Sequence, residues 1–262
     1  KKLTDLVTAK NDTYLAMSGT AIKDMVDLWA NEVSGTTAMG LVAAGDYTPD
    51  TTSATLYNYT LNLDSNLDFL MLTFDETIDV STFLASQFTF DNGSNRSMPL
   101  SGGTVLTTND RIVKIQLSVD DRHELKRLGD LCITSATTFL SMGATGFKDM
   151  AWVANDCNSV TSKVVENYQR DNTNPWLVSF YANIDTVRIS FMLNEPVNTS
   201  TLNTSAIVLQ NNAATPTESF RLTGGFTNSP DGKQVVVHIT HDDMNVIKKF
   251  ENLYTNNATT FV

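Results

Sequence analysis

Hydrophobic residues recur at every second position in several short segments of the chain, a pattern typical of strands that bury one face. The alternating segments are 69–74, 113–117, 188–193 and 235–239. In the first of them, Leu70, Leu72 and Phe74 share the face that we predict to be buried. Further strands are predicted at 137–142 and near 160–168, so the pattern indicates an all-β protein.

Two short helices are predicted between the strands, each directly after an alternating segment. They cover 119–128 and 241–250. Ser118 and Thr240 stand at their N-cap positions, where a side-chain hydroxyl accepts a hydrogen bond from a free backbone N–H of the first turn. Asp121 and Asp243 follow three residues later, as in a capping box, in which this side chain bonds back to the N-cap backbone.

The chain contains an internal repeat. Residues 1–26 align without a gap on 126–151 with eleven identities, which include the run Lys23-Asp24-Met25 on Lys148-Asp149-Met150. Residues 126–140 align in turn on 248–262, so the offset between copies is 122 to 125 residues. One complete repeat therefore stands between two partial ones.

About seven short strands and one short helix in each repeat of about 120 residues predict tandem Ig-like β-sandwiches. We expect residues 50–170 to form a complete Ig-like domain. Residues 171–262 form a second Ig-like domain without its last strand. Residues 1–49 are a terminal segment equivalent to the end of a repeat, and they are a candidate donor strand.

The order of short motifs resembles the Ig-like repeats of bacterial S-layer and adhesin proteins, and it is similar to repeats in the surface hairs (mastigonemes) of protists. The motifs are Phe74-Asp75-Glu76-Thr77-Ile78-Asp79, Phe88-Thr89-Phe90, Leu100-Ser101-Gly102-Gly103, Thr138-Phe139-Leu140 and Phe147-Lys148-Asp149-Met150-Ala151. The chain departs from this pattern at Trp152 and Val153, where the family usually has Gly before the Asn of the turn. The resemblance implies a structural, array-forming role without catalytic residues.

Composition and charge narrow the function classes. The formal charge is -11, and the basic residues form no cluster longer than the pair Lys248-Lys249, so we expect no nucleic-acid partner. No apolar run approaches the roughly 18 residues that a membrane helix needs. Abundant Thr and Ser, with only 18% charged residues, favour an extracellular or cell-surface β protein.

Modification sites are predicted from two residue types. Seven Asn-X-Ser/Thr sequons are candidates for N-linked glycans: Asn11, Asn58, Asn92, Asn95, Asn198, Asn203 and Asn257. Cys132 and Cys157 both fall in the complete repeat, and in an oxidising compartment a disulfide between them would close a loop of about 25 residues and stabilise by roughly 3 kcal/mol. Two free or buried thiols are the alternative.

The residues that could carry chemistry have simpler structural interpretations. His238 and His241 match no common zinc spacing, and Glu76 and Glu195 are equivalent positions of two repeats. Helix capping explains the acidic pairs at 120–121 and 242–243 more simply than calcium does. A sugar-stacking platform of Trp29, Trp152 and Trp176 is opposed by the expected place of Trp176 in a core. We expect no enzyme activity, no metal and no cofactor.

The two incomplete ends of the repeat array predict self-assembly. Residues 171–262 lack a last turn and strand, and residues 16–49 are the equivalent sequence at the other end of the chain. Donation of this segment to a neighbouring copy makes a head-to-tail contact that propagates as a filament. The predicted interface comprises Met39, Leu41, Ala43 and Tyr47 of the donor and Phe69 and Met71, which are apolar on the outer face of a strand.

Two alternatives stay open at this point. Residues 1–15 duplicate 248–262, so a donated segment would arrive with a redundant helix and half a strand. The chain is therefore also consistent with an excerpt of a long tandem Ig-like surface protein. A third interpretation is a glycan-binding adhesin module.

Overall fold

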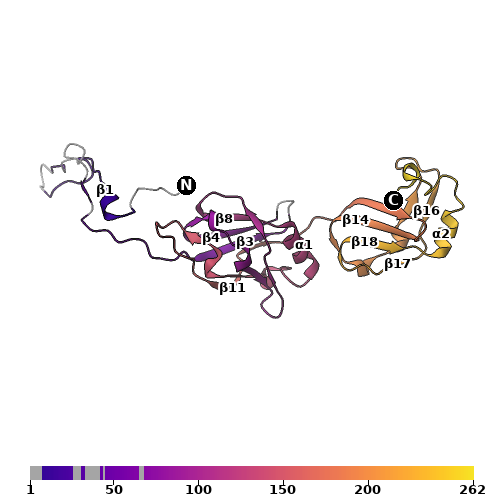
Figure 1. The fold of residues 1–262 in the computed structure, drawn as a ribbon, viewed down its shortest axis with the longest axis horizontal. Helices are drawn as coiled ribbons and strands as arrows, with labels where there is room; N and C mark the ends of the chain where they lie inside the picture. The colour runs from indigo at the N-terminus through magenta and orange to yellow at the C-terminus, as the bar shows by residue number, and fades with distance from the viewer. Residues whose placement is uncertain (1–7, 26–30, 33–41, 44, 65–67) are drawn as a thin grey trace. The chain divides into compact units, whose positions relative to one another are not determined.

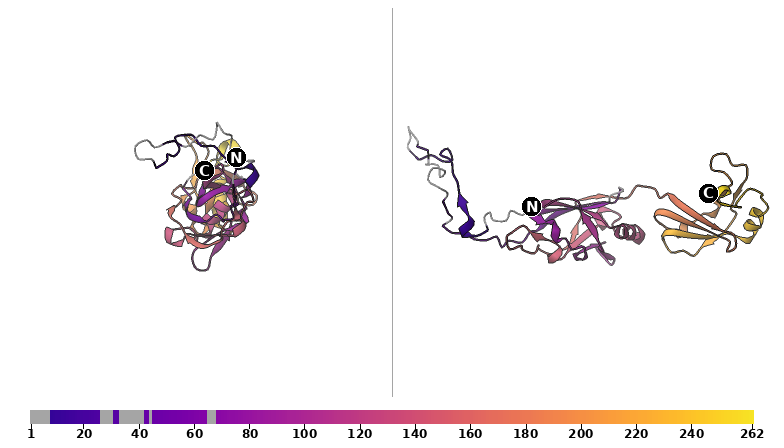
Figure 2. Two further views of the ribbon diagram at one scale, coloured as in Figure 1. Left: turned by 90° about the vertical axis from the view of Figure 1, so that its left-hand side faces the viewer. Right: turned by 45° about the horizontal axis from the view of Figure 1, so that its top comes forward.

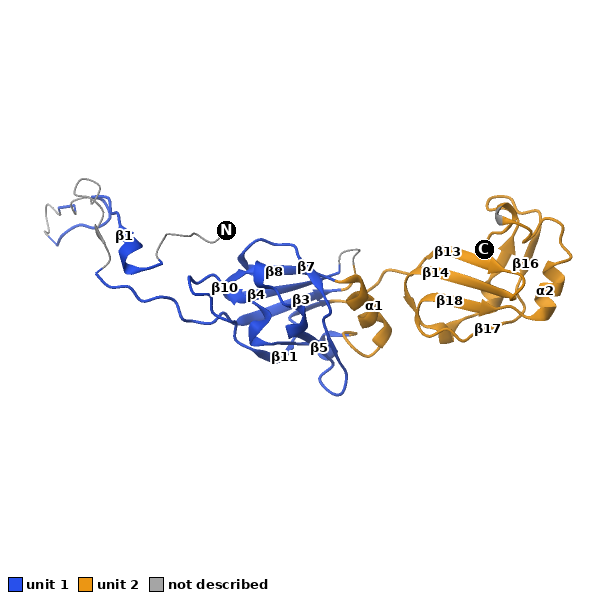
Figure 3. Cartoon of the chain, viewed as in Figure 1, with its two compact units in different colours: residues 1–62, 67–117, 134–168 blue, residues 63–66, 118–133, 169–262 orange. Residues whose placement is uncertain are grey.

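The structure is a computed structural model that describes residues 8–25, 31–32, 42–43, 45–64 and 68–262. It is mainly β, with antiparallel sheets and, in the described residues, two α-helices, which confirms the predicted class (Figure 1). The chain divides into two compact units (Figure 3). Unit 1 comprises residues 1–62, 67–117 and 134–168, and unit 2 comprises 63–66, 118–133 and 169–262.

The larger sheet of unit 1 is built around the predicted strand at 69–74, which extends to Asp79. Across the sheet the strands are β12 (Asn167–Gln169), β3 (Leu56–Asn62), β4 (Phe69–Asp79), β8 (Asp110–Leu117) and β7 (Gly103–Val105), with β10 (Lys148–Asp149) pairing with the end of β4. Leu70, Leu72 and Phe74 are fully buried, as the alternation predicts.

A second sheet of unit 1 faces the same core. Its strands in order are β11 (Val160–Val164), β9 (Phe139–Met142), β5 (Phe88–Asp91) and β6 (Ser97–Pro99). The fully buried ring of Phe147 joins the two sheets, because its centroid lies 5.9 Å from that of Phe74 in β4 and 5.7 Å from that of Phe88 in β5. The strand predicted near 160–168 is in fact two strands, β11 and β12, in different sheets.

Unit 2 repeats these elements in shorter form. Its larger sheet has the order β13 (Leu177–Asn183), β14 (Arg188–Val197), β18 (Gly232–His238) and β17 (Phe226–Thr227), and a two-stranded sheet is formed by β15 (Val208–Gln210) and β16 (Ser219–Arg221). Ile189, Leu209 and Leu222 form its buried core with residues of the second helix. Figure 2 shows the sheets of both units from two further directions.

The two helices begin where the sequence predicts. α1 (Val119–Leu128) and α2 (His241–Ile247) are capped by the hydroxyls of Ser118 and Thr240, which accept from the backbone N–H of Asp121 and Asp243 at 3.0 Å. The second helix is shorter than the predicted 241–250. The capping-box prediction is wrong for Asp243, whose carboxylate instead accepts hydrogen bonds from the backbone of residues 223 and 224 in the β16–β17 loop.

The described part of the terminal segment forms a small sheet of its own. β1 (Tyr14–Leu15) pairs antiparallel with β2 (Val42–Ala43), after the short 3₁₀ helix η1 (Lys10–Asp12). The other 3₁₀ helices are η3 (Val80–Thr82), η4 (Ala85–Gln87), η5 (Ser135–Thr137), η6 (Ala144–Gly146), η7 (Thr199–Thr201), η8 (Thr204–Ala206) and η9 (Asn257–Thr259). Among the described residues, no helix has the length and apolar character to cross a membrane.

Two predictions about single side chains are corrected. Cys132 and Cys157 are both buried thiols with no disulfide between them, which is the alternative to the predicted bridge. Burial and the nearby carboxylates of Asp149 and Glu76 raise the pKa of Cys157 to about 12, so its thiol stays protonated at neutral pH. Trp176, expected in a core, is 53% exposed.

Candidate functional site

The two units repeat each other closely enough to be compared position by position. Thr52 N donates to Asp50 Oδ1 at 2.9 Å, and Thr173 N donates to Asp171 Oδ1 at 3.0 Å. β13 pairs with β14 in the register in which β3 pairs with β4. A position in one unit can therefore be compared with its equivalent in the other.

Three strands of unit 1 have no counterpart among the described residues of unit 2. They are β10, β11 and β12, all supplied by residues 148–169. In unit 1, β12 pairs with the outer side of β3. In unit 2, the strand equivalent to β3 is β13, which is the edge strand of its sheet. β5 pairs with the four residues of β9, whereas β15 has only a single bridge on that side, between Gln210 and Phe261. As far as the described residues show, unit 2 thus presents unpaired strand edges, which are templates for a further strand.

An apolar pocket of about 400 Å³ opens between the two sheets of unit 2. Its lining residues are Leu177, Phe191, Leu193, Ala206, Ile207, Val208, Gln210 and Val262. In unit 1 the positions of Leu193 and Ile207 are held by Phe74 and Phe88, which are fully buried against the ring of Phe147. In unit 2 both side chains are only partly buried, so the pocket lies where Phe147 lies in unit 1.

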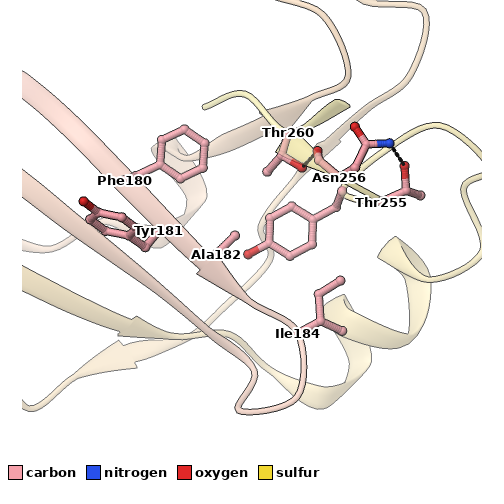
Figure 4. A pocket seen from close by; sticks show the side chains of 8 residues that line it. Phe180, Tyr181, Ala182, Ile184, Thr255, Asn256 and Thr260 are labelled. Atoms are coloured by element: carbon pink, nitrogen blue, oxygen red, sulfur yellow. Dashed lines mark hydrogen bonds between the residues drawn. The ribbon is translucent and has the colours of Figure 1, made fainter. Parts of the chain in front are cut away.

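A second pocket of about 430 Å³ lies along β13 (Figure 4). It is lined by Phe180, Tyr181, Ala182 and Ile184, which face Tyr254, Thr255, Asn256 and Thr260. In unit 1 the position of Phe180 is held by Tyr59, which is fully buried. Val165, which is 5% exposed, lies beside Tyr59, because its backbone N–H and the Tyr59 hydroxyl both donate to Thr138 O, at 3.1 and 2.9 Å. The two pockets together mark the path that residues 143–169 follow over unit 1, and we call them the open groove.

Residues of the terminal segment repeat the structure of that covering segment. Asn31 N donates to Asp24 Oδ1 at 2.8 Å, as Asn155 N does to Asp149 Oδ1. The pairs of β1 and β2 are Tyr14↔Ala43 and Leu15↔Val42. Tyr14 and Leu15 align with Phe139 and Leu140 of β9, whose partners in β11 are Val164 and Lys163, so Ala43 and Val42 hold the places of these two residues. Two local features of the end of a repeat are therefore present in the described residues between 8 and 43.

Ile22 is the residue of this segment that aligns with Phe147. Phe147 is fully buried, whereas Ile22 is 62% exposed. Leu15, which aligns with the fully buried Leu140, is 60% exposed. The sequence prediction of the interface did not include Ile22. The alignment of 1–26 on 126–151 pairs Ile22 with Phe147, but only the structure shows that the Phe147 side chain is fully buried between the two sheets.

The predicted interface residues lie in different places. Met39 and Leu41 are outside the described residues, Ala43 is in β2, and Tyr47 is partly buried. Phe69 and Met71 are partly buried on the outer face of β4, where the Lys114 ammonium group lies 4.0 Å from the centroid of the Phe69 ring. Lys114 therefore supplies part of the cover that these apolar residues need.

The other sequence candidates lie apart from the open groove. Asn11, Asn95, Asn198 and Asn203 are exposed, Asn58 and Asn92 are partly buried, and Asn257 begins η9. His238 stacks on Phe226 with ring centroids 4.7 Å apart. Trp152 is 52% exposed. Trp29 is outside the described residues.

Comparison with protein-family models, with curated proteins and with solved structures finds no match to this chain.

Proposed function

We propose that this chain is a structural subunit of an extracellular or cell-surface filament, built from Ig-like domains that assemble head to tail. In this proposal, residues 16–47 of one copy lie in the open groove of unit 2 of another copy. The chain has no catalytic role, and its partners are copies of itself and N-linked glycans on exposed sequons.

One observation carries the proposal. Unit 2 leaves Leu193 and Ile207 open at the place where unit 1 buries Phe147, and the terminal segment exposes Ile22 at the position of Phe147. The ring of Phe147 is buried in unit 1, and the side chains equivalent to both partners of that contact are thus at least partly exposed elsewhere in the same chain. A second copy supplies the complementary half for each.

The contact is of the strand-addition type, in which backbone hydrogen bonds provide affinity and side-chain pockets provide specificity. Leu177 and Val262, both 41% exposed, lie at the rim of the pocket that Ile22 is proposed to fill. Burial of these and the neighbouring apolar side chains would contribute about 4–6 kcal/mol by apolar-area reasoning. Each copy offers one donor and one groove, so the contact does not close on itself and extends into a linear polymer.

The chain of residues 1–262 tests this function directly. We expect its average mass in sedimentation velocity to rise with concentration, and electron micrographs to show unbranched filaments. A chain that stays monomeric at high concentration would contradict the proposal. An intact mass of the native protein far above the 28.8 kDa of this sequence would favour the alternative, a longer tandem array whose next repeat covers the groove.

A further inference from the structure

Three carboxylates gather at one place in unit 1. Oxygen atoms of Asp50, Glu76 and Asp149 all lie within 4.8 Å of one another. Asp149 is 1% exposed and is held by Asn155, whose backbone N–H and side-chain amide both donate to it at 2.8 Å. Burial and the negative charges of Asp50, Asp149 and Asp75 raise the pKa of Glu76. The cluster therefore concentrates negative charge in a partly buried place.

The equivalent place in unit 2 contains a lysine. Asp171 and Glu195 hold the positions of Asp50 and Glu76, and the Lys126 ammonium nitrogen lies 2.9 Å from Asp171 Oδ2 and 2.6 Å from Glu195 Oε2. Glu195 is 6% exposed, and the ammonium group offsets the cost of burying its negative charge. Burial opposes the charge of Lys126, but its hydrogen bonds to Glu195 and Asp171 outweigh this and raise its pKa.

The repeat contains a second lysine of this kind. Lys126 belongs to α1, and the alignment of 126–140 on 248–262 places Lys248, at the end of α2, on it. Lys248 is exposed, and no acidic group forms an ion pair with it in the described part of the chain. The helix that carries Lys126 precedes the repeat that carries Asp171 and Glu195. In a head-to-tail polymer, α2 of one copy would likewise precede unit 1 of the next.

We propose that Lys248 of one copy binds the Asp50, Glu76 and Asp149 cluster of the next copy. This inference rests on the proposed function and adds the partner of a second contact at the same junction. Three carboxylates at this spacing also suit a divalent cation. The ammonium group is the ligand we infer because it occupies the equivalent site in unit 2.

A charge exchange in the full chain tests the contact. Lys248→Glu and Glu76→Lys should each raise the critical concentration for assembly roughly 30-fold or more, because the first places a fourth carboxylate against the cluster and the second places an ammonium group inside it, where Lys248 would bind. The double variant, Lys248→Glu with Glu76→Lys, should recover most of this loss. Lys249→Glu is the matched control, since it makes the same charge change at the next residue, and it should leave assembly within about threefold of the original.

The outcomes separate the inference from the function beneath it. Filaments of the original chain that tolerate Lys248→Glu as well as Lys249→Glu would overturn the contact but leave strand donation intact. A loss produced by Lys1→Glu and not by Lys248→Glu would assign the cluster to the terminus of its own chain. Assembly that EDTA abolishes and Lys248→Glu does not affect would assign it to a metal ion. If the original chain never assembles, the proposed function fails first.

Discussion

Removal of residues 1–49 is expected to abolish assembly and to leave unit 1 folded. Among the described residues, the buried hydrophobic core of unit 1 begins at Ala54, and its central residues Phe74, Phe88 and Phe147 all follow it. The deletion therefore removes the proposed donor without opening this core. The open groove of unit 2 stays uncovered in every copy.

The melting temperature of unit 2 should also show the loss of the donor segment. With about 4 kcal/mol of apolar burial missing, unit 2 should melt at least about 15 °C below its temperature in assembled full-length chains. Calorimetry of both chains at matched concentration measures this difference. Unit 2 that melts cooperatively at the same temperature with and without residues 1–49 would show that nothing from this segment covers the groove.

Removal of only residues 1–15 is expected to have the opposite effect and to strengthen assembly. β1 holds β2 in the register Tyr14↔Ala43. By the equivalence with Phe139↔Val164 of β9 and β11, the same β2 would pair with Phe261 of an acceptor copy. Residues 8–15 are thus paired, within their own chain, with the strand β2 that the acceptor copy would bind. They must separate from β2 before the donor segment can enter the acceptor.

The size of this effect follows from the few hydrogen bonds of a two-residue strand. Breaking these hydrogen bonds costs the full chain about 1–2 kcal/mol at each donation. A chain without residues 1–15 does not have this cost, so its critical concentration should be about tenfold lower. Light scattering on chains 1–262 and 16–262 measures the change. A Gly/Ser stretch in place of residues 1–15 keeps the length and should behave like the deletion. Slower or weaker assembly of either variant would mean that residues 1–15 take part in the polymer contact.

Sequence alone predicts the local elements of this fold well, because their causes are local. The alternation at Leu70, Leu72 and Phe74 specifies which face of β4 is buried, and the N-cap hydroxyls of Ser118 and Thr240 specify where α1 and α2 begin. These features depend on backbone geometry and on neighbours within a few residues.

The long-range features could not be predicted in the same way. Leu193 follows the same alternation as Phe74, yet it is only partly buried, because none of the described residues of unit 2 fills the place that Phe147 fills in unit 1. Asp243 has the spacing of a capping box, but its carboxylate binds the backbone of the β16–β17 loop, 19 and 20 residues earlier in the chain. The repeat identified which segment was equivalent to the cover of unit 1, but not which of its side chains plugs the core.

A cross-link between two copies tests strand donation most directly. Ala43 and Phe261 hold the positions of Val164 and Phe139, which lie opposite each other in β11 and β9. Opposite residues of antiparallel strands have Cα atoms about 4.5–5.5 Å apart, which suits a disulfide. One chain carries the single substitution Ala43→Cys, and a second chain carries the single substitution Phe261→Cys. Cys132 and Cys157, which both chains also contain, are buried at 2% exposure.

The two chains are mixed under mild oxidation, and the products are mapped by mass spectrometry. Strand donation predicts a disulfide-linked pair of one chain of each kind, joined at residues 43 and 261, in much higher yield than when Lys249→Cys replaces Phe261→Cys. No such pair, or equal yields from positions 249 and 261, would contradict the account.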